Sequence, residues 1–326
     1  MNPNLLADII ADPAMDFLRP ALSPESASQI LSRALGRQME VAVVRGRRHK
    51  PARRCVIEYD LRSGTGLPQT VVGKVRVKGA DRRTFALLQA LWENGFNEDA
   101  SDRIHVPEPL AIVPELRMLL AAKAPGVSTG DLLYNPGNVD LAHRIAAVAW
   151  KLHRAGVPSH RAHTAKDELL ILQDRFAKVG IAHSDWSERL AKVLDRCERI
   201  ASRLPPANPV GIHRDFYPAQ VLVDSPRCWL LDLDLYCLGD PAVDIGNFIG
   251  HMTEHSLRTV GDPDAFLKTE VALRNEYVRL SGGATTAEAI DIYKLWTVAR
   301  HIYISTLFPD RHAVTSRLLE YCERQI

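Results

Sequence analysis

The sequence has little cysteine, and its cysteines are scattered. Five occur among 326 residues, and no two have the Cys-x-x-Cys spacing; they are Cys55, Cys197, Cys228, Cys237 and Cys322. A disulfide framework needs an even set of cysteines, and a structural zinc site needs closely spaced pairs, so the sequence favours neither. An odd number of dispersed thiols is typical of a reducing compartment, and we therefore expect a cytoplasmic protein.

Long apolar runs are also absent. No stretch approaches the roughly 18 uninterrupted apolar residues that a membrane-spanning helix needs. The opening stretch MNPNLLADIIADPAMDF carries acids within its apolar part and lacks the basic region of a secretory signal. Repeats at a fixed period and low-complexity tracts are missing too, which disfavours a solenoid or a long disordered tail. We therefore expect neither a membrane span nor a secreted protein.

An excess of charge of either sign is missing as well. The chain has 41 basic and 39 acidic residues, a net charge of +2. This balance does not favour nucleic acid or a membrane surface as a partner, so any anion-binding site must be local. With 46% hydrophobic residues the chain can bury a large core as one big domain or two lobes. The sequence indicates no oligomeric state.

The first part of the chain has the pattern of a β-sheet with one helix. Between residues 40 and 77 three alternating runs, MEVAVV, RRCVIEYDLR and QTVVGKVRVK, predict an antiparallel meander. The segment ADRRTFALLQALWENGF then predicts a helix that packs on the meander and stops at Gly95. Its expected apolar face consists of Phe85, Leu88, Leu91 and Trp92. Two further extended runs, PEPLAIVPEL and RMLLAAKAPG, follow.

Beyond this point the pattern becomes helical. Asn138 is a candidate N-cap for a helix that ends at Gly156, and amphipathic runs follow over 185–204, 264–282, 287–308 and 313–325. We place the connection between lobes near residues 121–125. The sequence therefore predicts an α+β fold in which a small antiparallel β-sheet N-lobe, residues 1–120, precedes a larger, mainly α C-lobe, residues 121–326.

Acidic and amide side chains concentrate around one predicted hairpin. The stretch HRDFYPAQVLVD is joined by the turn SPR to CWLLDLDL, and the two apolar runs predict a β-hairpin. The hairpin would bring Asp215, Gln220 and Asp232 to one end. Magnesium prefers such oxygen ligands and usually keeps waters and substrate phosphates in its shell. Asp215 would remain free to orient or deprotonate an incoming hydroxyl.

At these residues the sequence resembles the aminoglycoside phosphotransferase and choline kinase superfamily, whose fold is protein-kinase-like. The catalytic motif of that family is His-x-Asp followed, five residues after the aspartate, by Asn; here it reads His213, Asp215 and Gln220. The resemblance implies that Asp215 is catalytic. It gives His213 no obvious role in proton transfer, and we expect this side chain to brace the loop by hydrogen bonding.

The metal motif of the family is similar to LLDLD in this chain. The resemblance implies that Asp232 is the principal magnesium ligand, with Asp234 as a neighbouring acid. We expect Asp232 and Asp234 to lie in one otherwise apolar strand and, two residues apart, to face the same side, where buried acids are costly without a cation or donor. The following segment GDPAVDIGNF also matches, which implies that Asp244 holds the catalytic loop by hydrogen bonds rather than by touching the nucleotide.

The resemblance also implies that a strand lysine contacts the nucleotide phosphates, and Lys74 in TVVGKVRVK is the stronger candidate, ahead of Lys78. In the kinase fold this lysine pairs with a helix glutamate, but the predicted helix offers no acid in its middle. Glu93 or Gln89 could serve if the helix is rotated, or Lys74 acts alone. The backbone of residues 121–124, including Ala122 and Ala124, is expected to hydrogen-bond the adenine edge.

The turn after the first strand, RGRRHKPARR, has one glycine and many basic side chains. Side-chain charge could therefore replace part of the glycine-rich phosphate loop of kinases, with Arg47, Arg48 or Lys50 clamping a phosphate or an anionic acceptor. A solvated basic hairpin tip is an equally good interpretation. Gln220 is a further departure, because its extra methylene displaces the carbonyl oxygen by about one bond length, and octahedral magnesium tolerates little misplacement.

Together these features predict an ATP- and Mg²⁺-dependent phosphotransferase that moves the γ-phosphoryl group to a hydroxyl of a small molecule. An amino-sugar, a choline-like amine and a sugar all remain open as acceptors; HRDFY is also similar to lipopolysaccharide core kinases. Acceptor contacts should come from the C-terminal helices, where the candidates are Glu254, Asp262, Asp264, Arg300 and His301. The alternative is a pseudokinase that binds nucleotide or a partner without transfer. A metal-dependent phosphohydrolase is a third interpretation.

Overall fold

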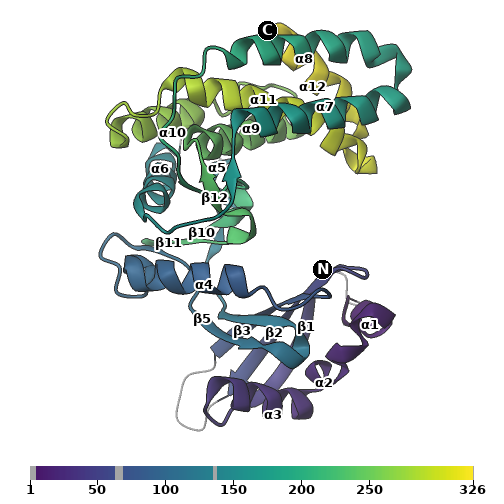
Figure 1. Cartoon of the computed structure of the whole chain (residues 1–326), viewed down its shortest axis with the longest axis vertical. Helices are drawn as coiled ribbons and strands as arrows, with labels where there is room; N and C mark the ends of the chain where they lie inside the picture. The colour runs from purple at the N-terminus through teal and green to yellow at the C-terminus, as the bar shows by residue number, and fades with distance from the viewer. Residues whose placement is uncertain (1–4, 63–68, 135–137, 326) are drawn as a thin grey trace. The chain divides into compact units, whose positions relative to one another are not determined.

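The computed structural model describes residues 5–62, 69–134 and 138–325 (Figure 1). The chain divides into two units, Met1–Pro125 and Gly126–Ile326. The division falls after Pro125 because β6 (Met118–Ala122) is still a strand of the first unit's sheet.

The first unit is built on a five-stranded antiparallel sheet in the order β1-β2-β3-β6-β5. The expected meander is confirmed by the three strands that pair in sequence. The strands are β1 (Glu40–Lys50), β2 (Arg54–Arg62), β3 (Gln69–Arg76) and β5 (Pro109–Val113), in addition to β6. A short strand, β4 (Ile104–His105), precedes β5.

Three helices absent from the sequence expectations pack on one face of this sheet. They are α1 (Leu5–Ile10), α2 (Arg19–Leu22) and α3 (Pro24–Leu35). Their buried side chains, such as Ile9 and Leu31, share one apolar core with inward residues of the strands, such as Ile57 and Val71. Because strand side chains alternate between faces, the residues between these inward positions lie on the opposite face of the sheet.

The predicted helix of the first unit is α4 (Arg82–Leu91), which contacts β5. Asp81 caps it by accepting a hydrogen bond from the Thr84 N–H at 3.0 Å. The helix runs on into a π-helical turn, Trp92–Phe96, that ends around Gly95 at a φ of 81°. Of its expected apolar face, Leu88 and Leu91 are buried together with Leu87, whereas Phe85 and Trp92 are only half-buried.

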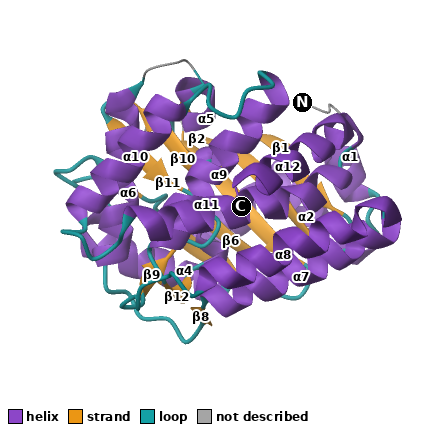
Figure 2. Cartoon of the chain, turned by 90° about the horizontal axis from the view of Figure 1, so that it is seen from above, coloured by secondary structure: helices purple, strands orange, loops and turns teal. Residues whose placement is uncertain are grey.

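The second unit is mainly helical, as expected (Figure 2). Asn138 is the N-cap of α6, as its sequence position predicts. The segment that forms α7 was not predicted from the sequence, although Thr164 and Asp167 form a capping box at its start. The helices are α5 (Thr129–Leu133), α6 (Val139–Arg154), α7 (Ala165–Ala182), α8 (Ser187–Ala201), α9 (Ala242–Thr259), α10 (Leu267–Leu280), α11 (Ala287–Thr306) and α12 (His312–Gln325).

Helices α9 and α11 lie side by side with their backbones close together (Figure 2). A Cβ at Gly246 would lie 2.5 Å from the Tyr293 Cβ and 2.8 Å from the Lys294 N. A Cβ at Gly250 would lie 2.6 Å from the Thr297 Cβ. Glycine is therefore required at both positions for the two helices to approach this closely.

Short strands carry the segments that flank the predicted hairpin. The hairpin is confirmed as β10 (Val221–Asp224) and β11 (Arg227–Leu230), and β7 (Val127–Ser128) pairs with the other side of β10. A second small sheet has β12 (Cys237–Gly239) between β8 (Ala162–His163) and β9 (Val210–Ile212).

The cysteines and the hydropathy of the helices bear on two expectations from the sequence, the absence of disulfides and the absence of a membrane span. All five cysteines are buried free thiols. Burial raises the pKa of Cys55 to about 12, so this thiol stays protonated at neutral pH. Within the described ranges, no helix combines the length and the apolar character that crossing a membrane requires.

Candidate functional site

Two loops that carry the predicted catalytic and metal-binding acids leave neighbouring strands at the same end. β9 and β12 are antiparallel, with Ile212 opposite Cys237, so the loop after β9 and the loop before β12 begin side by side. The Leu231 N–H donates to the Gln220 carbonyl at 2.8 Å. The ring of His213 also reaches the Leu231 carbonyl, at 2.7 Å. The segment 213–220 and the segment that starts at Leu231 are therefore joined by hydrogen bonds.

Asp244 of α9 holds the loop that follows β9 through the backbone of that loop. Its fully buried carboxylate accepts the backbone N–H groups of His213 and Arg214, each at 2.7 Å. It also contacts His153 Nε2 at 2.9 Å, and the other ring nitrogen of His153 hydrogen-bonds the buried Tyr277 hydroxyl. These bonds confirm the sequence-based prediction that Asp244 holds the loop that carries Asp215. His153 and Tyr277 were not predicted, because their positions in the sequence are far from the loop.

His213 has the bracing geometry that the sequence suggested. The side chain is fully buried, and its Nδ1 accepts the Asp215 N–H at 3.3 Å. Its Nε2 therefore carries the proton and donates it to the Leu231 carbonyl. With both ring nitrogens engaged in holding the two loops together, His213 is a positioning residue in this structure.

Two residues of these loops have a left-handed backbone. Arg214 has a φ of 69°, and Asp232 has a φ of 56°. For residues other than glycine this conformation costs on the order of 1–3 kcal/mol and persists only where the surroundings enforce it. At Arg214 the bond from its N–H to Asp244 supplies part of that enforcement. Strain of this kind collects at functional sites, which supports a functional role for the loops.

Asp215 lies half-buried among charged groups. Burial raises the pKa of its carboxyl, and the negative charges of Asp232 and Asp244 raise it further, whereas His213 and Arg300 lower it. The carboxylates of Asp215 and Asp232 are therefore close enough to repel each other. A cation bound to Asp232 would relieve this repulsion, so the pair fits a metal-assisted site.

Arg300 and Asn247 support the same loop from two helices. The Asn247 amide donates to the Phe216 carbonyl at 2.8 Å, and its oxygen accepts from the Arg300 guanidinium. Arg300 also donates to Glu168 at 3.2 Å. The residue after Asp215 is thus held by a buried network that begins on α9 and α11.

The side chain of Gln220 is nearly buried but makes no hydrogen bond to the described residues. Only 7% of this residue is exposed, and its backbone is fixed by bonds to Tyr217 and Leu231. Its side-chain amide has no hydrogen-bond partner within residues 5–62, 69–134 and 138–325. The amide atoms are absent from the set of buried atoms without a partner, so solvent or a cation can reach them, and an amide oxygen of this kind can serve as a metal ligand.

The prediction that Asp232 and Asp234 share one face of a strand is wrong. β11 ends at Leu230, Asp232 adopts the left-handed conformation, and Asp234 lies in a 3₁₀ turn, Leu233–Leu235. The left-handed residue breaks the strand, so the apolar alternation of LLDLDL does not continue as β-structure. In the described part of the chain no three His, Cys, Asp or Glu side chains form a metal-binding group.

In the first unit Lys74 lies on the face of the sheet that is opposite the apolar core. Its neighbours Gly73 and Val75 are buried, and in the register Lys74 stands between Val56 and Leu119. The two candidate partners of Lys74, Gln89 and Glu93, are both exposed on or just after α4. Which group pairs with Lys74 stays a prediction.

Arg47 also lies in the first unit, and it has an acidic partner that the sequence did not reveal. Its guanidinium lies 2.6 Å from Glu58, a buried acid of β2, and Lys123 lies 3.1 Å from the same carboxylate. An incoming phosphate would compete with Glu58 for Arg47. At the tip of the same hairpin burial lowers the pKa of Lys50, as do the charges of Arg54 and Arg48, so an anion would relieve this crowding.

Only some backbone groups of residues 122–124 are available to hydrogen-bond an adenine. The Ala122 N–H donates to the Glu108 carbonyl at 2.9 Å, and the Lys123 N–H donates to the Thr70 carbonyl at 3.0 Å. The Ala124 N–H has no partner in the part of the chain that the structure describes. An adenine edge could therefore be met by the Ala124 N–H and the Ala122 carbonyl, but not by the Ala122 N–H.

The acceptor candidates fall into two groups. His301 is buried and contacts His251 edge-on, and His251 stacks on Tyr217 of the catalytic loop with ring centres 4.6 Å apart. Burial lowers the pKa of His301 to about 4, so this ring is neutral at physiological pH. Glu254 is buried and bound to Arg258.

Arg300 and His301 are thereby linked to the catalytic loop. Asp262 and Asp264, by contrast, are exposed, and Asp264 lines a separate cavity among the helices. The structure therefore brings only part of the predicted acceptor set to the loop.

Comparisons with known proteins give one family. A model of the phosphotransferase enzyme family matches residues 76–279. A search of the curated proteins finds no match.

Among solved structures, a spectinomycin phosphotransferase in complex with ADP and spectinomycin has a TM-score of 0.58 at 12% identity, covering 93% of this chain and 94% of that one. A choline/ethanolamine kinase family protein from Mesorhizobium loti has a TM-score of 0.58 at 16% identity, covering 95% and 92%. An aminoglycoside phosphotransferase in complex with AMP-PNP and hygromycin B has a TM-score of 0.58 at 16% identity, covering 92% of this chain and 97% of that one. These likenesses confirm the expected α+β, protein-kinase-like fold.

Proposed function

Because the chain belongs to the phosphotransferase enzyme family, we propose that it transfers the γ-phosphoryl group of ATP to a hydroxyl of a small molecule. One observation carries the proposal: a loop fixed by the buried Asp244 presents the carboxylate of Asp215 close enough to Asp232 for the charge of Asp232 to raise the pKa of Asp215. Phosphoryl transfer asks the protein mainly for positioning and for neutralisation of charge. The expected class of enzyme, a small-molecule kinase, follows from the family.

Each residue has a role in the proposed reaction. Asp215 orients the acceptor hydroxyl toward the γ-phosphorus and accepts its proton as the new oxygen–phosphorus bond forms, while the bond from the γ-phosphorus to the bridging oxygen breaks and ADP leaves. Asp232 and Gln220, with Asp234 as a further acid, would hold Mg²⁺, which when bound neutralises charge on the phosphates. Lys74 and Arg47 would hold phosphate oxygens, and Arg47 must exchange Glu58 for phosphate to do so. The backbone at Ala122 and Ala124 would receive the adenine edge.

The similar structures suggest which acceptors to test first. The similar structures include a spectinomycin phosphotransferase and a choline/ethanolamine kinase family protein, so amino-sugars and choline-like alcohols should lead the panel, with simple sugars beside them. The pseudokinase alternative finds no support in the comparisons. Two departures from the family pattern motivate that alternative, Gln220 in place of Asn and the missing helix glutamate, and the substitutions at Gln220 described below test the first.

A panel of hydroxyl-bearing metabolites, arrayed by acceptor class and scored for conversion of ATP to ADP, tests the proposal. We expect ADP formation that depends on one class of acceptor and on Mg²⁺. Asp232→Ala is the blank, because removal of the principal metal ligand should abolish acceptor-dependent turnover. ADP formation that is equal in the Asp232→Ala protein would overturn the assignment of the metal site. Nucleotide binding without turnover on any acceptor would revive the pseudokinase.

Substitutions at Gln220 test the metal-ligand role of its amide. Gln220→Asn retains a carbonyl oxygen, so we expect turnover and Mg²⁺ dependence to be kept. Gln220→Ala removes the oxygen, and we expect the Mg²⁺ concentration at half-maximal rate to rise by at least the roughly 10–100-fold that loss of an outer-shell metal partner costs. Titration of the initial rate with Mg²⁺ measures both variants. An alanine variant as active as the wild type at every Mg²⁺ concentration would show that Gln220 is not a ligand.

A further inference from the structure

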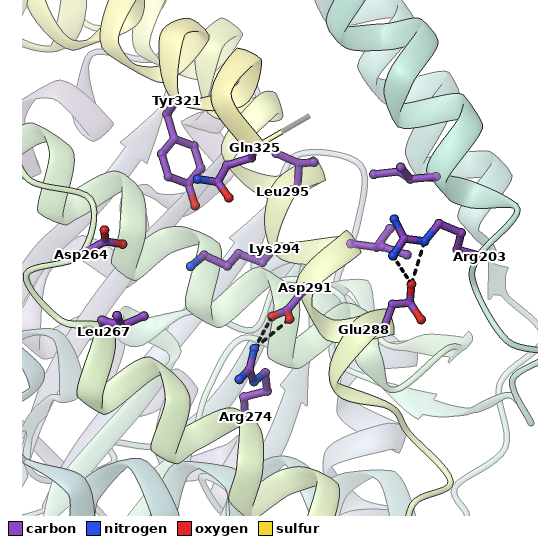
Figure 3. A pocket seen from close by; sticks show the side chains of 12 residues that line it. Arg203, Asp264, Leu267, Arg274, Glu288, Asp291, Lys294, Leu295, Tyr321 and Gln325 are labelled. Carbon is purple, nitrogen blue, oxygen red and sulfur yellow. Dashed lines mark hydrogen bonds and ion pairs between the residues drawn. The ribbon is translucent and has the colours of Figure 1, made fainter.

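A cavity of about 650 Å³ lies among α8, α10, α11 and α12 (Figure 3). Its volume is within the range of small-molecule sites, roughly 300–1,000 Å³. None of the residues proposed above to bind nucleotide or metal, or to take part in catalysis, lines it. The cavity therefore needs an explanation of its own.

Most charges in the wall of this cavity already neutralise one another. Arg274 binds Asp291 with contacts of 2.7 and 3.0 Å, and Arg203 pairs with Glu288, which lies three residues before Asp291 on α11 (Figure 3). These pairs shape the wall but leave little unsatisfied charge there. The capacity to recognise a ligand must come from the remaining polar groups.

Lys294 offers unused hydrogen-bond donors to the cavity. Its ammonium donates to Glu270 at 2.7 Å, and the second oxygen of Glu270 accepts from Thr253 at 3.0 Å. The Lys294 side chain is only 16% exposed. An ammonium has three donors, and across the described ranges Glu270 is the only hydrogen-bond partner of this one. Figure 3 shows the ammonium directed into the open space.

Tyr321 offers a second donor beside it. The residue is 5% exposed, and its hydroxyl has no hydrogen-bond partner in the described portion of the chain. Figure 3 shows this hydroxyl directed into the same space as Lys294. Burial raises the pKa of Tyr321, so the hydroxyl keeps its proton at neutral pH and can donate it. The ring of Tyr321 is buried, whereas its hydroxyl is not among the buried atoms without a partner and opens onto the cavity, where the oxygen of a ligand could accept its hydrogen bond.

We propose that this cavity binds a small molecule through an anionic oxygen group, a carboxylate or a phosphate, that accepts hydrogen bonds from Lys294 Nζ and Tyr321 Oη. The carbon skeleton of the ligand would lie against Leu267 and Leu295, which line the same cavity. The exposed carboxylate of Asp264 lies in the wall as well, and it gives the site a place for a positive group on the ligand. The site is a second one, distinct from the proposed acceptor site.

Calorimetric titration of the full chain with two probes tests the proposal and distinguishes the two sources of the anionic group. Glycerol 3-phosphate represents phosphate monoesters, and malate represents carboxylates. We expect one of them to bind the wild type, and Tyr321→Phe to weaken that binding by at least about tenfold, because a hydrogen bond to a charged group is lost. Tyr303→Phe is the matched control, since Tyr303 lies on α11 outside the cavity lining and its loss of a hydroxyl should leave binding unchanged.

The same variant separates binding from folding. Because the Tyr321 hydroxyl has no partner in the ranges described, its removal should leave the melting temperature of the ligand-free protein unchanged, while the stabilisation by the probe disappears. The proposal is overturned if neither probe binds the wild type, or if Tyr321→Phe and the wild type bind alike. Neither result bears on phosphoryl transfer, which is measured separately.

Discussion

Replacement of Asp215 by alanine is expected to lower the rate of phosphoryl transfer by about 10²–10⁴-fold, the usual contribution of a positioned general base. The loop that carries Asp215 is held by Asp244 and Asn247, whose bonds go to backbone groups, so the loop should keep its shape without the side chain. Nucleotide binding should therefore persist. Initial rates with the best acceptor, together with calorimetric titration of ATP, measure the two effects separately.

Asp224→Ala is the matched control for this experiment. Asp224 is an aspartate at the far end of the same hairpin, where it pairs with Arg227 near the surface. Exposed pairs of this kind contribute about 0–1 kcal/mol, so rate and binding should both stay near the wild-type values. A fully active Asp215→Ala protein would remove Asp215 from the reaction, and a variant that loses ATP binding as well would point to a structural role.

The second large effect is expected for stability. Asp244→Ala should lower the free energy of unfolding by about 3–5 kcal/mol, because it leaves His153 and two backbone N–H groups buried without their acceptor. Asp244→Asn keeps one carbonyl oxygen, but its amide hydrogens oppose other donors, so its loss should be intermediate. Urea unfolding followed by circular dichroism measures both, provided that the slope of the transition is unchanged.

Asp195→Ala provides the comparison for a surface acid. Asp195 is exposed and pairs with Arg199 one helical turn away, so we expect its removal to change the free energy of unfolding by less than about 1 kcal/mol. If Asp244→Ala and Asp195→Ala unfold at the same urea concentration, the buried network around Asp244 does not stabilise the protein.

Local patterns in the sequence were sufficient for most of the secondary structure near the site. The hairpin at 221–230 follows from two apolar runs and a proline turn, and the N-cap at Asn138 follows from residue type and position. Reliance on local patterns also explains the wrong prediction of a strand around Asp232. The alternation of apolar residues continues through LLDLDL, but the backbone is left-handed at Asp232. Strand alternation gives no warning of a single residue with positive φ.

Partners distant in the sequence could not be predicted from local patterns. His153 reaches Asp244 across 91 residues, and Asn247 reaches the Phe216 carbonyl across 31 residues. The pairing of Arg47 with Glu58 depends on an irregularity in the register of β1 and β2 between Gly46 and Arg48, which no local pattern reveals. The basic residue types indicated that Arg47 would have an anionic partner, but only the fold determines that this partner is Glu58.

The close contact of α9 and α11 at Gly246 and Gly250 has a consequence for evolution and engineering. Because a Cβ at either glycine would collide with α11, neither position tolerates a larger residue without shifting the helix that carries Asp244 and Asn247. We therefore expect substitutions that change the choice of substrate to be tolerated only outside this seam. A mutant library aimed at new acceptors should accordingly leave both glycines fixed and diversify the outward residues near the C-terminal ends of the two helices.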